Sequence, residues 1–271
     1  MNTARLKNIV IMILLLANAF LLVLLLSRQV EESAARERSL TQLTALFEAN
    51  GIALDPALLD TLPGSLPDAQ PVRDADAERA LAEGIIGSVS SVDSGGGIYR
   101  YYSSDGLGGG VCLIRSSGAL EAELSRAVDD PAAFCSGLCA PLGYSVYETL
   151  ADGKRTVITA SRTIEDCEVF NAALTFTFLS GTLTDVSGSF LPPIDTDDLA
   201  ALPLDAVTAL VHFLDYRNAS GAVCTDITRL CAGYLLQSSA SVSMQLVPVL
   251  RVETDVYSYY VNLENGAVTR E

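Results

Sequence analysis

The chain has 271 residues, of which 49% are hydrophobic and 18% charged, and 33 acidic side chains outnumber 17 basic ones for a formal net charge of −16. This composition excludes a disordered polar tail, because disordered chains are poor in apolar residues. It also argues against nucleic-acid binding, since few basic side chains are available to neutralise phosphates. The single histidine, His212, excludes any metal site that needs two imidazole ligands.

Residues 1–30 differ from the rest of the chain in charge and hydropathy. They contain three basic residues and no acidic one, and residues 9–26 contain no ionisable side chain. A helix of that length measures roughly 27 Å, which approaches the thickness of a bilayer's hydrocarbon core. The alternative is a cleaved signal peptide, whose apolar stretch is usually shorter, at about 7–15 residues. The pattern therefore predicts a membrane segment, and we favour an uncleaved single-pass anchor.

The orientation of this anchor depends on the charges beside it. Basic residues flank the predicted span on both sides, and glutamates that follow it neutralise the downstream ones. Long domains translocate largely regardless of charge. We therefore expect a cytoplasmic N-terminus and an extracytoplasmic C-terminal domain at the cell membrane.

Asn18 is the one polar side chain inside the predicted span. An amide in hydrocarbon is costly unless it is paired, and side-chain hydrogen bonds between membrane helices contribute roughly 0.6–2 kcal/mol. Asn18 therefore favours a partner helix, the alternative being a bond to its own backbone or to a water defect. Spacing of three to four residues defines the contact stripe on one helix face. Its members are Ile11, Leu14, Leu15, Asn18, Leu21, Leu22 and Leu25.

Residues 31–74 are expected to form a juxtamembrane helix and a proline-rich linker. Apolar residues recur at helical spacing from Leu40 to Phe47, and Asn50-Gly51 offers a C-terminal stop. Prolines and a glycine then interrupt the chain over residues 61–73. A short helical stalk therefore connects the anchor to the folded region.

Residues 75–164 are expected to form a first folded module. Alternating apolar residues over 85–114 predict strands, and helical spacing predicts a helix over 118–134. Two further alternating segments, 144–150 and 155–163, flank an Asp-Gly turn. The predicted order of this module is ββαββ.

Residues 165–271 repeat that order as a second module. A hairpin is predicted over 169–191, followed by a helix at about 197–216 and by strands between residues 228 and 270. The fold class is therefore α+β, an N-terminal transmembrane helix followed by two tandem ββαββ-type modules with antiparallel sheets.

The six cysteines leave two interpretations open. An exported domain could pair them in many alternative disulfide arrangements. Equally, they could be buried small apolar residues, since free cysteine packs well in cores. No spacing corresponds to a CxxC motif or a zinc knuckle. The residues are Cys112, Cys135, Cys139, Cys167, Cys224 and Cys231.

Catalytic groups are scarce along the chain. His212 lies in an apolar helical setting without a G-x-S-x-G or S-x-x-K motif, which favours a packed or surface histidine over a general base. The glycine-rich residues 106–110 lack the lysine and spacing of a phosphate loop. Asp195, Asp197 and Asp198 are typical of a helix start rather than of a cation site. We therefore expect no enzyme, no catalytic residues, no metal and no cofactor.

Two parts of the chain resemble a known family. The first is the basic start and span with the run Asn18-Ala19-Phe20-Leu21-Leu22. The second is residues 165–271, where a hairpin and an acid-capped helix precede Gly233-Tyr234, Leu246-Val247-Pro248-Val249-Leu250-Arg251-Val252 and Tyr259-Tyr260-Val261-Asn262-Leu263-Glu264-Asn265-Gly266-Ala267-Val268. Together they resemble the YycH/YycI family, and the closing tyrosine-strand-Asn-Gly-Val arrangement is similar to PepSY-like domains.

The YycH/YycI resemblance implies a single-span protein of a Gram-positive bacterium. It implies regulation of a two-component sensor histidine kinase linked to cell-wall metabolism, through membrane and extracytoplasmic contacts and with a YycH-like co-regulator as a further partner. The PepSY-like similarity implies an alternative, a propeptide-type inhibitor of an exported peptidase. An uncharacterised envelope enzyme is the third possibility.

Overall fold

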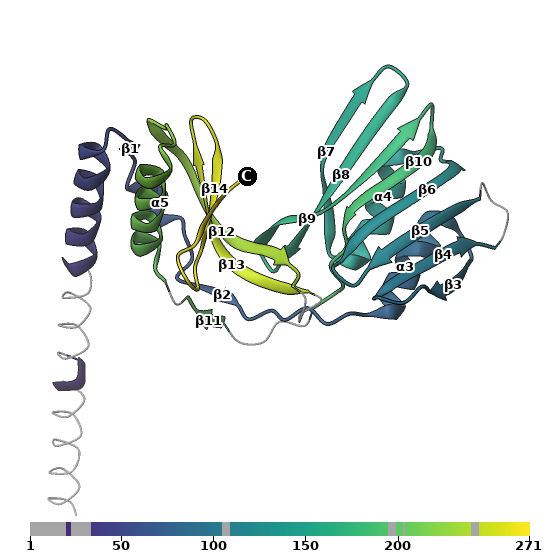
Figure 1. Cartoon of the computed structure of the whole chain (residues 1–271), viewed down its shortest axis with the longest axis horizontal. Helices are drawn as coiled ribbons and strands as arrows, with labels where there is room; N and C mark the ends of the chain where they lie inside the picture. The colour runs from purple at the N-terminus through teal and green to yellow at the C-terminus, as the bar shows by residue number, and fades with distance from the viewer. Residues whose placement is uncertain (1–19, 23–33, 105–108, 195–198, 203, 240–243) are drawn as a thin grey trace, which may run out of the picture.

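The fold is α+β and is dominated by one large mixed sheet, as the computed structural model shows (Figure 1). Thirteen strands of the described residues belong to this sheet, and a separate two-stranded sheet lies beside it. The α+β class is therefore confirmed, whereas the two separate antiparallel sheets that we predicted are joined into one. The structure describes residues 20–22, 34–104, 109–194, 199–202, 204–239 and 244–271.

Three consecutive units of the chain share one order of elements, a helix followed by four antiparallel strands. The first unit comprises α3 (Ala75–Ile86), β3 (Val89–Asp93), β4 (Ile98–Ser103), β5 (Gly110–Arg115) and β6 (Ala119–Ala127). The second comprises α4 (Pro131–Cys139), the short 3-10 helix η1 (Ala140–Leu142), β7 (Tyr144–Asp152), β8 (Arg155–Ile164), β9 (Cys167–Leu179) and β10 (Thr182–Ser189). The third comprises α5 (Ala206–Ser220), β12 (Asp226–Gln237), β13 (Gln245–Thr254), β14 (Ser258–Asn262) and β15 (Val268–Arg270).

The first two units form one continuous sheet with a shared core. β6 and β10 pair antiparallel over seven residue pairs, which gives the order β3-β4-β5-β6-β10-β9 with β8 and β7 beyond β9. Helices α3 and α4 cover the same face of this sheet (Figure 1). The hairpin predicted over 169–191 is present, but it completes this sheet rather than opening a separate one. The predicted module boundary between residues 164 and 165 falls between β8 and β9, which pair with each other.

The helix predicted over 118–134 is wrong for its first half, which is strand β6. Leu120 and Leu124 are four residues apart, a spacing that fits one face of a helix and one face of a strand equally well. Ala122 between them is 1% exposed and shares their face, whereas Glu121 and Glu123 are exposed. Pairing with both β5 and β10 selects the period of two. The predicted ββαββ order is thereby replaced by a helix with four strands.

The N-terminal region packs on the third unit. A helix over residues 34–49 ends where predicted, and Gly51 takes the left-handed conformation with φ 73° that follows a helix C-terminus. The next elements are β1 (Ala53–Leu54), which pairs in parallel with β12, the helical turn α2 (Ala57–Asp60), and β2 (Ser65–Pro67), which pairs with β11 (Leu199–Ala201). The segment thus runs along the third unit although the first unit follows it in sequence.

The core of the third unit contains side chains of helix 34–49. Leu43 and Phe47 are 3% and 0% exposed, and they pack in one cluster with residues of α5, β12, β13 and β14. The Phe47 ring stacks on Phe213 at a centroid distance of 6.5 Å, and Phe213 meets Tyr259 edge-on at 5.2 Å. Helix 34–49 and α5 accordingly lie side by side (Figure 1).

The third unit joins the larger sheet through a short parallel contact. Only Gly233 and Tyr234 of β12 pair with β9, opposite Glu168 and Val169. A side chain at 233 would collide with the carbonyl oxygen of Glu168, so this approach requires glycine. The Tyr234 hydroxyl donates a hydrogen bond to the carbonyl of Pro67. The Gly233-Tyr234 pair therefore holds three segments together at the junction.

Helix α5 begins later than predicted. It starts at Ala206, and Asp205 is its N-cap, with Oδ1 accepting a hydrogen bond from the Thr208 amide at 2.8 Å. The sequence predicts a start near residue 197, because Asp197 and Asp198 also fit a helix start. Asp195, Asp197 and Asp198 lie outside the described residues.

Candidate binding pocket

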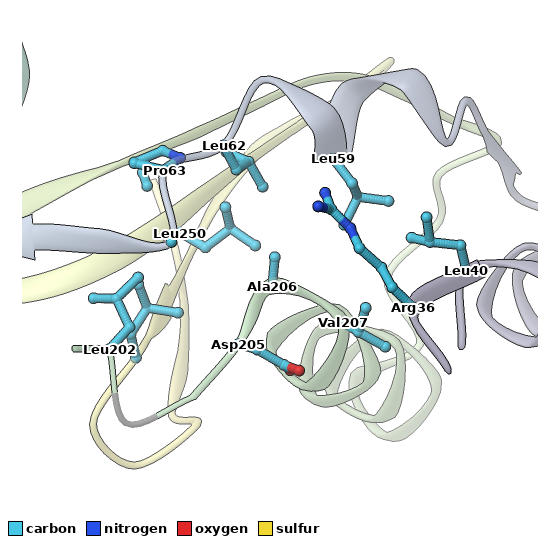
Figure 2. A pocket seen from close by; sticks show the side chains of 13 residues that line it. Arg36, Leu40, Leu59, Leu62, Pro63, Leu202, Asp205, Ala206, Val207 and Leu250 are labelled. Carbon is cyan, nitrogen blue, oxygen red and sulfur yellow. The ribbon is translucent and has the colours of Figure 1, made fainter. Parts of the chain in front are cut away.

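The candidate functional site is an apolar pocket between helix 34–49 and the third unit (Figure 2). Its volume is about 330 Å³. Ala232, Leu250 and Leu263 of the third unit form its floor, and all three are buried. The pocket is therefore bounded on one side by the sheet and on the other by the segment that connects to the predicted anchor.

The turn of α2 and the N-terminus of α5 position the apolar walls. Asp55 accepts a hydrogen bond from the Ala57 amide at 2.9 Å and so starts the turn of α2, which directs Leu59 to the pocket. Leu62 and Pro63 follow directly after this turn and continue the same wall. The N-terminus of α5 forms the opposite wall with Ala206 and Val207, and the Ala206 methyl points toward the middle of the pocket (Figure 2).

Arg36 is the cationic group of the pocket. Its side chain extends from helix 34–49 so that the guanidinium faces the middle of the pocket (Figure 2). Nη2 donates to Asp60 Oδ1 at 3.2 Å, and these two side chains are 62% and 70% exposed. An ion pair this exposed contributes little, because water screens it. Asp205 also lines the pocket, but its carboxylate caps α5 and is turned away from Arg36 in Figure 2.

The predicted contact stripe of the span lies almost wholly outside the described residues. Leu21 and Leu22 are described, as part of a helical turn with Phe20, and they are 54% and 58% exposed. Ile11, Leu14, Leu15, Asn18 and Leu25 are outside the described residues. None of the helices that the structure describes is both long and apolar enough to cross a membrane. The anchor and its stripe stay predictions.

His212 lies on α5 against the turn between β14 and β15. A Cβ atom added at Gly266 would lie 2.7 Å from atoms of the His212 ring, so the ring rests directly on the backbone of that turn. This contact gives His212 a packing role. In the described parts of the chain, no group of three or more His, Cys, Asp or Glu side chains is arranged to hold a metal ion.

All six cysteines are free thiols in the structure, and four of them are buried. Cys112, Cys135 and Cys139 lie in the core shared by the first two units. Burial raises the pKa of Cys112 and of Cys135 to about 12, and that of Cys139 to about 11, because a thiolate is poorly solvated there. These three cysteines therefore behave as small core residues, one of the two interpretations that the sequence left open.

No pattern in the sequence predicts the pocket. Helical spacing predicts that Leu40 lies on a helix face, but this pattern does not indicate that the helix meets strands about 200 residues later. In the sequence, Arg36 is one of several basic residues that follow the predicted span. A pocket between distant segments has no local signal in the sequence.

Comparisons with known proteins give remote structural likenesses alone. No protein-family model and no curated protein matches the chain. An uncharacterized protein from Eubacterium rectale ATCC 33656 is similar in structure, with 12% identity, coverage of 76% of this chain and 80% of that chain, and a TM-score of 0.43. The Bacillus megaterium YpeB C-terminal domain is similar with 12% identity, coverage of 74% of this chain and 98% of that chain, and a TM-score of 0.39. Likenesses this remote carry no conclusion about function.

Proposed function

We propose that the protein is a membrane-anchored extracytoplasmic regulator that modulates a two-component sensor histidine kinase by protein contact. The observation that carries this proposal is the packing of helix 34–49. This helix follows the predicted span, and its Phe47 side chain is completely buried in the core of the third unit. We infer that a movement of the anchor would reach the folded domain through this docked helix.

Other observations support a binding role rather than catalysis. The YycH/YycI resemblance of residues 1–26 and 165–271 implies the kinase and a YycH-like co-regulator as partners. His212, the one histidine of the chain, is used in packing against the turn at Gly266. The predicted topology leaves the short N-terminal tip in the cytoplasm and the acidic domain outside.

The test replaces Asn18 by leucine, which removes the polar group from the predicted span. Asn18→Leu leaves membrane insertion intact, because a polar group is removed from lipid. It weakens association with a partner helix by roughly 1 kcal/mol, which is about a fivefold loss of affinity. The measurement is co-purification or proximity labelling of the kinase from native membranes at matched expression.

Leu16→Ile and Val23→Ile are the matched controls, because both residues lie off the predicted contact stripe. Capture equal to wild type is expected for both. If Asn18→Leu also captures the kinase as well as wild type does, the span is an anchor alone. Recovery of a metallopeptidase in place of a kinase would instead favour the PepSY-like inhibitor.

A further inference from the structure

The pocket combines an apolar interior with one cation, and this combination points to a ligand class. We propose that it binds a small anionic amphiphile, a carboxylate with a short hydrocarbon body, and that the bound molecule fastens helix 34–49 to the third unit. Binding itself is independent of the kinase proposal. The regulatory meaning of this fastening rests on the proposed function, because both involve helix 34–49.

The volume limits the size of the ligand. At about 330 Å³ the pocket is at the lower end of ligand sites in proteins. An eight-carbon acid is small enough for a pocket of this size. A phospholipid with two long chains is much larger, so a free short-chain amphiphile is favoured over a membrane lipid.

The walls favour a hydrocarbon body. Leucine, valine, alanine and proline side chains supply most of the lining, and the buried floor of Ala232, Leu250 and Leu263 offers no side-chain hydrogen-bond partner. A polar body would lose its hydrogen bonds to water without replacement. A hydrocarbon chain meets no such cost and removes apolar surface from water.

Arg36 favours a carboxylate head. A guanidinium has five N–H donors, and only the bond from Nη2 to Asp60 joins Arg36 to another side chain in the described residues. Its remaining donors can bind a carboxylate in the bidentate geometry that arginine prefers. The Asp205 carboxylate is held by the amide of Thr208, so it does not occupy the Arg36 side of the pocket.

A ligand in this pocket touches two parts of the fold at once. Arg36 and Leu40 belong to helix 34–49, whereas Ala206 and Val207 belong to α5. A molecule that contacts both adds to the packing that Leu43 and Phe47 already provide, because it binds only when the helix is docked. Ligand binding therefore slows any local detachment of helix 34–49.

The experiment uses the full chain in neutral phosphatidylcholine nanodiscs. The probe is octanoic acid that carries a photoreactive diazirine, and labelled peptides are mapped by mass spectrometry after irradiation. Wild type is expected to be labelled within residues 57–64 or 202–207. Unlabelled octanoate competes, whereas octylammonium of the same length competes much less, because Arg36 repels a cation.

Three variants sharpen the test. Ala206→Phe fills the middle of the pocket and is expected to abolish labelling. Arg36→Gln lowers affinity for octanoate roughly fivefold, a modest effect because the site is exposed. Arg38→Gln removes an exposed arginine of the same helix that does not line the pocket, and it leaves binding unchanged. Arg36 is a surface residue, so that variant stays informative even if Ala206→Phe fails to fold.

A second readout reports the fastening of the helix. Octanoate is expected to slow amide hydrogen exchange over residues 34–49 in wild type, and to slow it less in Arg36→Gln at the same subsaturating concentration. Equal labelling of folded Ala206→Phe and wild type, or equal competition by octanoate and octylammonium, would overturn the proposal. Kinase capture does not enter these measurements, so failure of the ligand site and failure of the regulatory role are distinguishable.

Discussion

The first two units and the third unit have the same order of elements, but they complete their cores differently. β6 and β10 join the first two units over seven residue pairs, and α3 and α4 share one core beneath that sheet. The third unit meets β9 over two residue pairs and takes Leu43 and Phe47 from helix 34–49 instead. The third unit, which pairs with another unit over only two residue pairs, thus completes its core with the N-terminal helix.

This difference joins helix 34–49 and the residues that follow it to the C-terminal part of the chain. The Asn218 amide donates to the side-chain oxygen of Asn50 across 168 residues of sequence, and β1 pairs with β12. The first unit is the next unit in sequence after helix 34–49, but none of its described residues belongs to the core cluster that buries this helix. The two regions should therefore respond separately to local changes.

The largest expected effect is on the third unit. Phe47→Ala removes a completely buried ring that stacks on Phe213, and it costs about 3–5 kcal/mol of unfolding free energy. Hydrogen exchange should accelerate over residues 34–49 and α5, while β5 and β6 keep their protection. Leu46→Ala is the control, because Leu46 is 41% exposed on the same helix. Equal acceleration in both regions would show that the cores are not separate.

The second prediction concerns the first unit instead of the third. Glu78 of α3 is buried and accepts from Arg73 Nε at 2.7 Å and from Nη2 at 3.0 Å. Glu78→Gln leaves Arg73 without its counterion and costs about 2–3 kcal/mol, below the range for fully buried pairs because Arg73 retains some exposure. Exchange should increase in the first unit and not in β13 or β14.

Glu83→Gln is the matched control for this ion pair. Arg79 and Glu83 form an exposed pair on the same helix at 3.5 Å, and such pairs contribute about 0–1 kcal/mol. Chemical denaturation should therefore detect Glu78→Gln and hardly detect Glu83→Gln. A large effect of both substitutions would mean that burial does not decide how much each ion pair contributes to the free energy of unfolding.

The third prediction concerns the junction between the two regions. Gly233→Ala places a methyl group against the Glu168 carbonyl and the Phe170 ring, and it costs about 1–3 kcal/mol. The pairing of β12 with β9 should loosen, which hydrogen exchange at Glu168 and Val169 measures. Unchanged protection there would show that the junction accommodates the methyl group while β12 and β9 stay paired.

Gly137→Ala provides a control glycine in α4. A Cβ atom at this position meets nothing within 4 Å, and alanine is the better helix former by about 1 kcal/mol. Gly137→Ala should thus leave stability unchanged or raise it slightly. The opposite signs of the two glycine substitutions separate steric collision from the general cost of replacing glycine.

The smallest effect is the alkaline pH dependence of the shared core. Burial raises the pKa of Cys112 from 9.0 to about 12. The unfolded chain releases this proton above pH 9 while the folded chain retains it, so the stability of the folded state falls as pH rises from 9 toward 12. One such thiol costs roughly 1 kcal/mol by pH 10.

Cys112→Ala tests the assignment of that slope. Denaturant titrations from pH 8 to pH 10.5 should show a shallower loss of stability for the variant than for wild type, whatever its stability at pH 8. Burial also raises the pKa of Cys135 and Tyr101 to about 12 and that of Cys139 to about 11, so these groups contribute the slope that remains in the variant. An identical slope in variant and wild type would remove Cys112 as a source.

The amino-acid sequence by itself determined the features that depend on near neighbours along the chain. Asp74 caps α3, its carboxylate accepting from the amides of Asp76 and Ala77, as aspartate does at helix N-termini. The Asp152-Gly153 turn, the helix end before Gly51 and the four strands of the third unit follow from turn chemistry and alternation. The predicted span and Asn18 also follow from local hydropathy, and they stay predictions.

The tertiary structure alone decided how these elements are shared among the cores. The spacing of Leu120 and Leu124 fits a helix and a strand, and only pairing on both edges makes β6 a strand. No local pattern indicates that the hairpin over 169–191 completes the sheet of the first unit, or that the Phe47 ring stacks on Phe213. Such contacts depend on which apolar faces remain uncovered after each unit has folded, and the pocket at Arg36 exists only because two of those faces meet there.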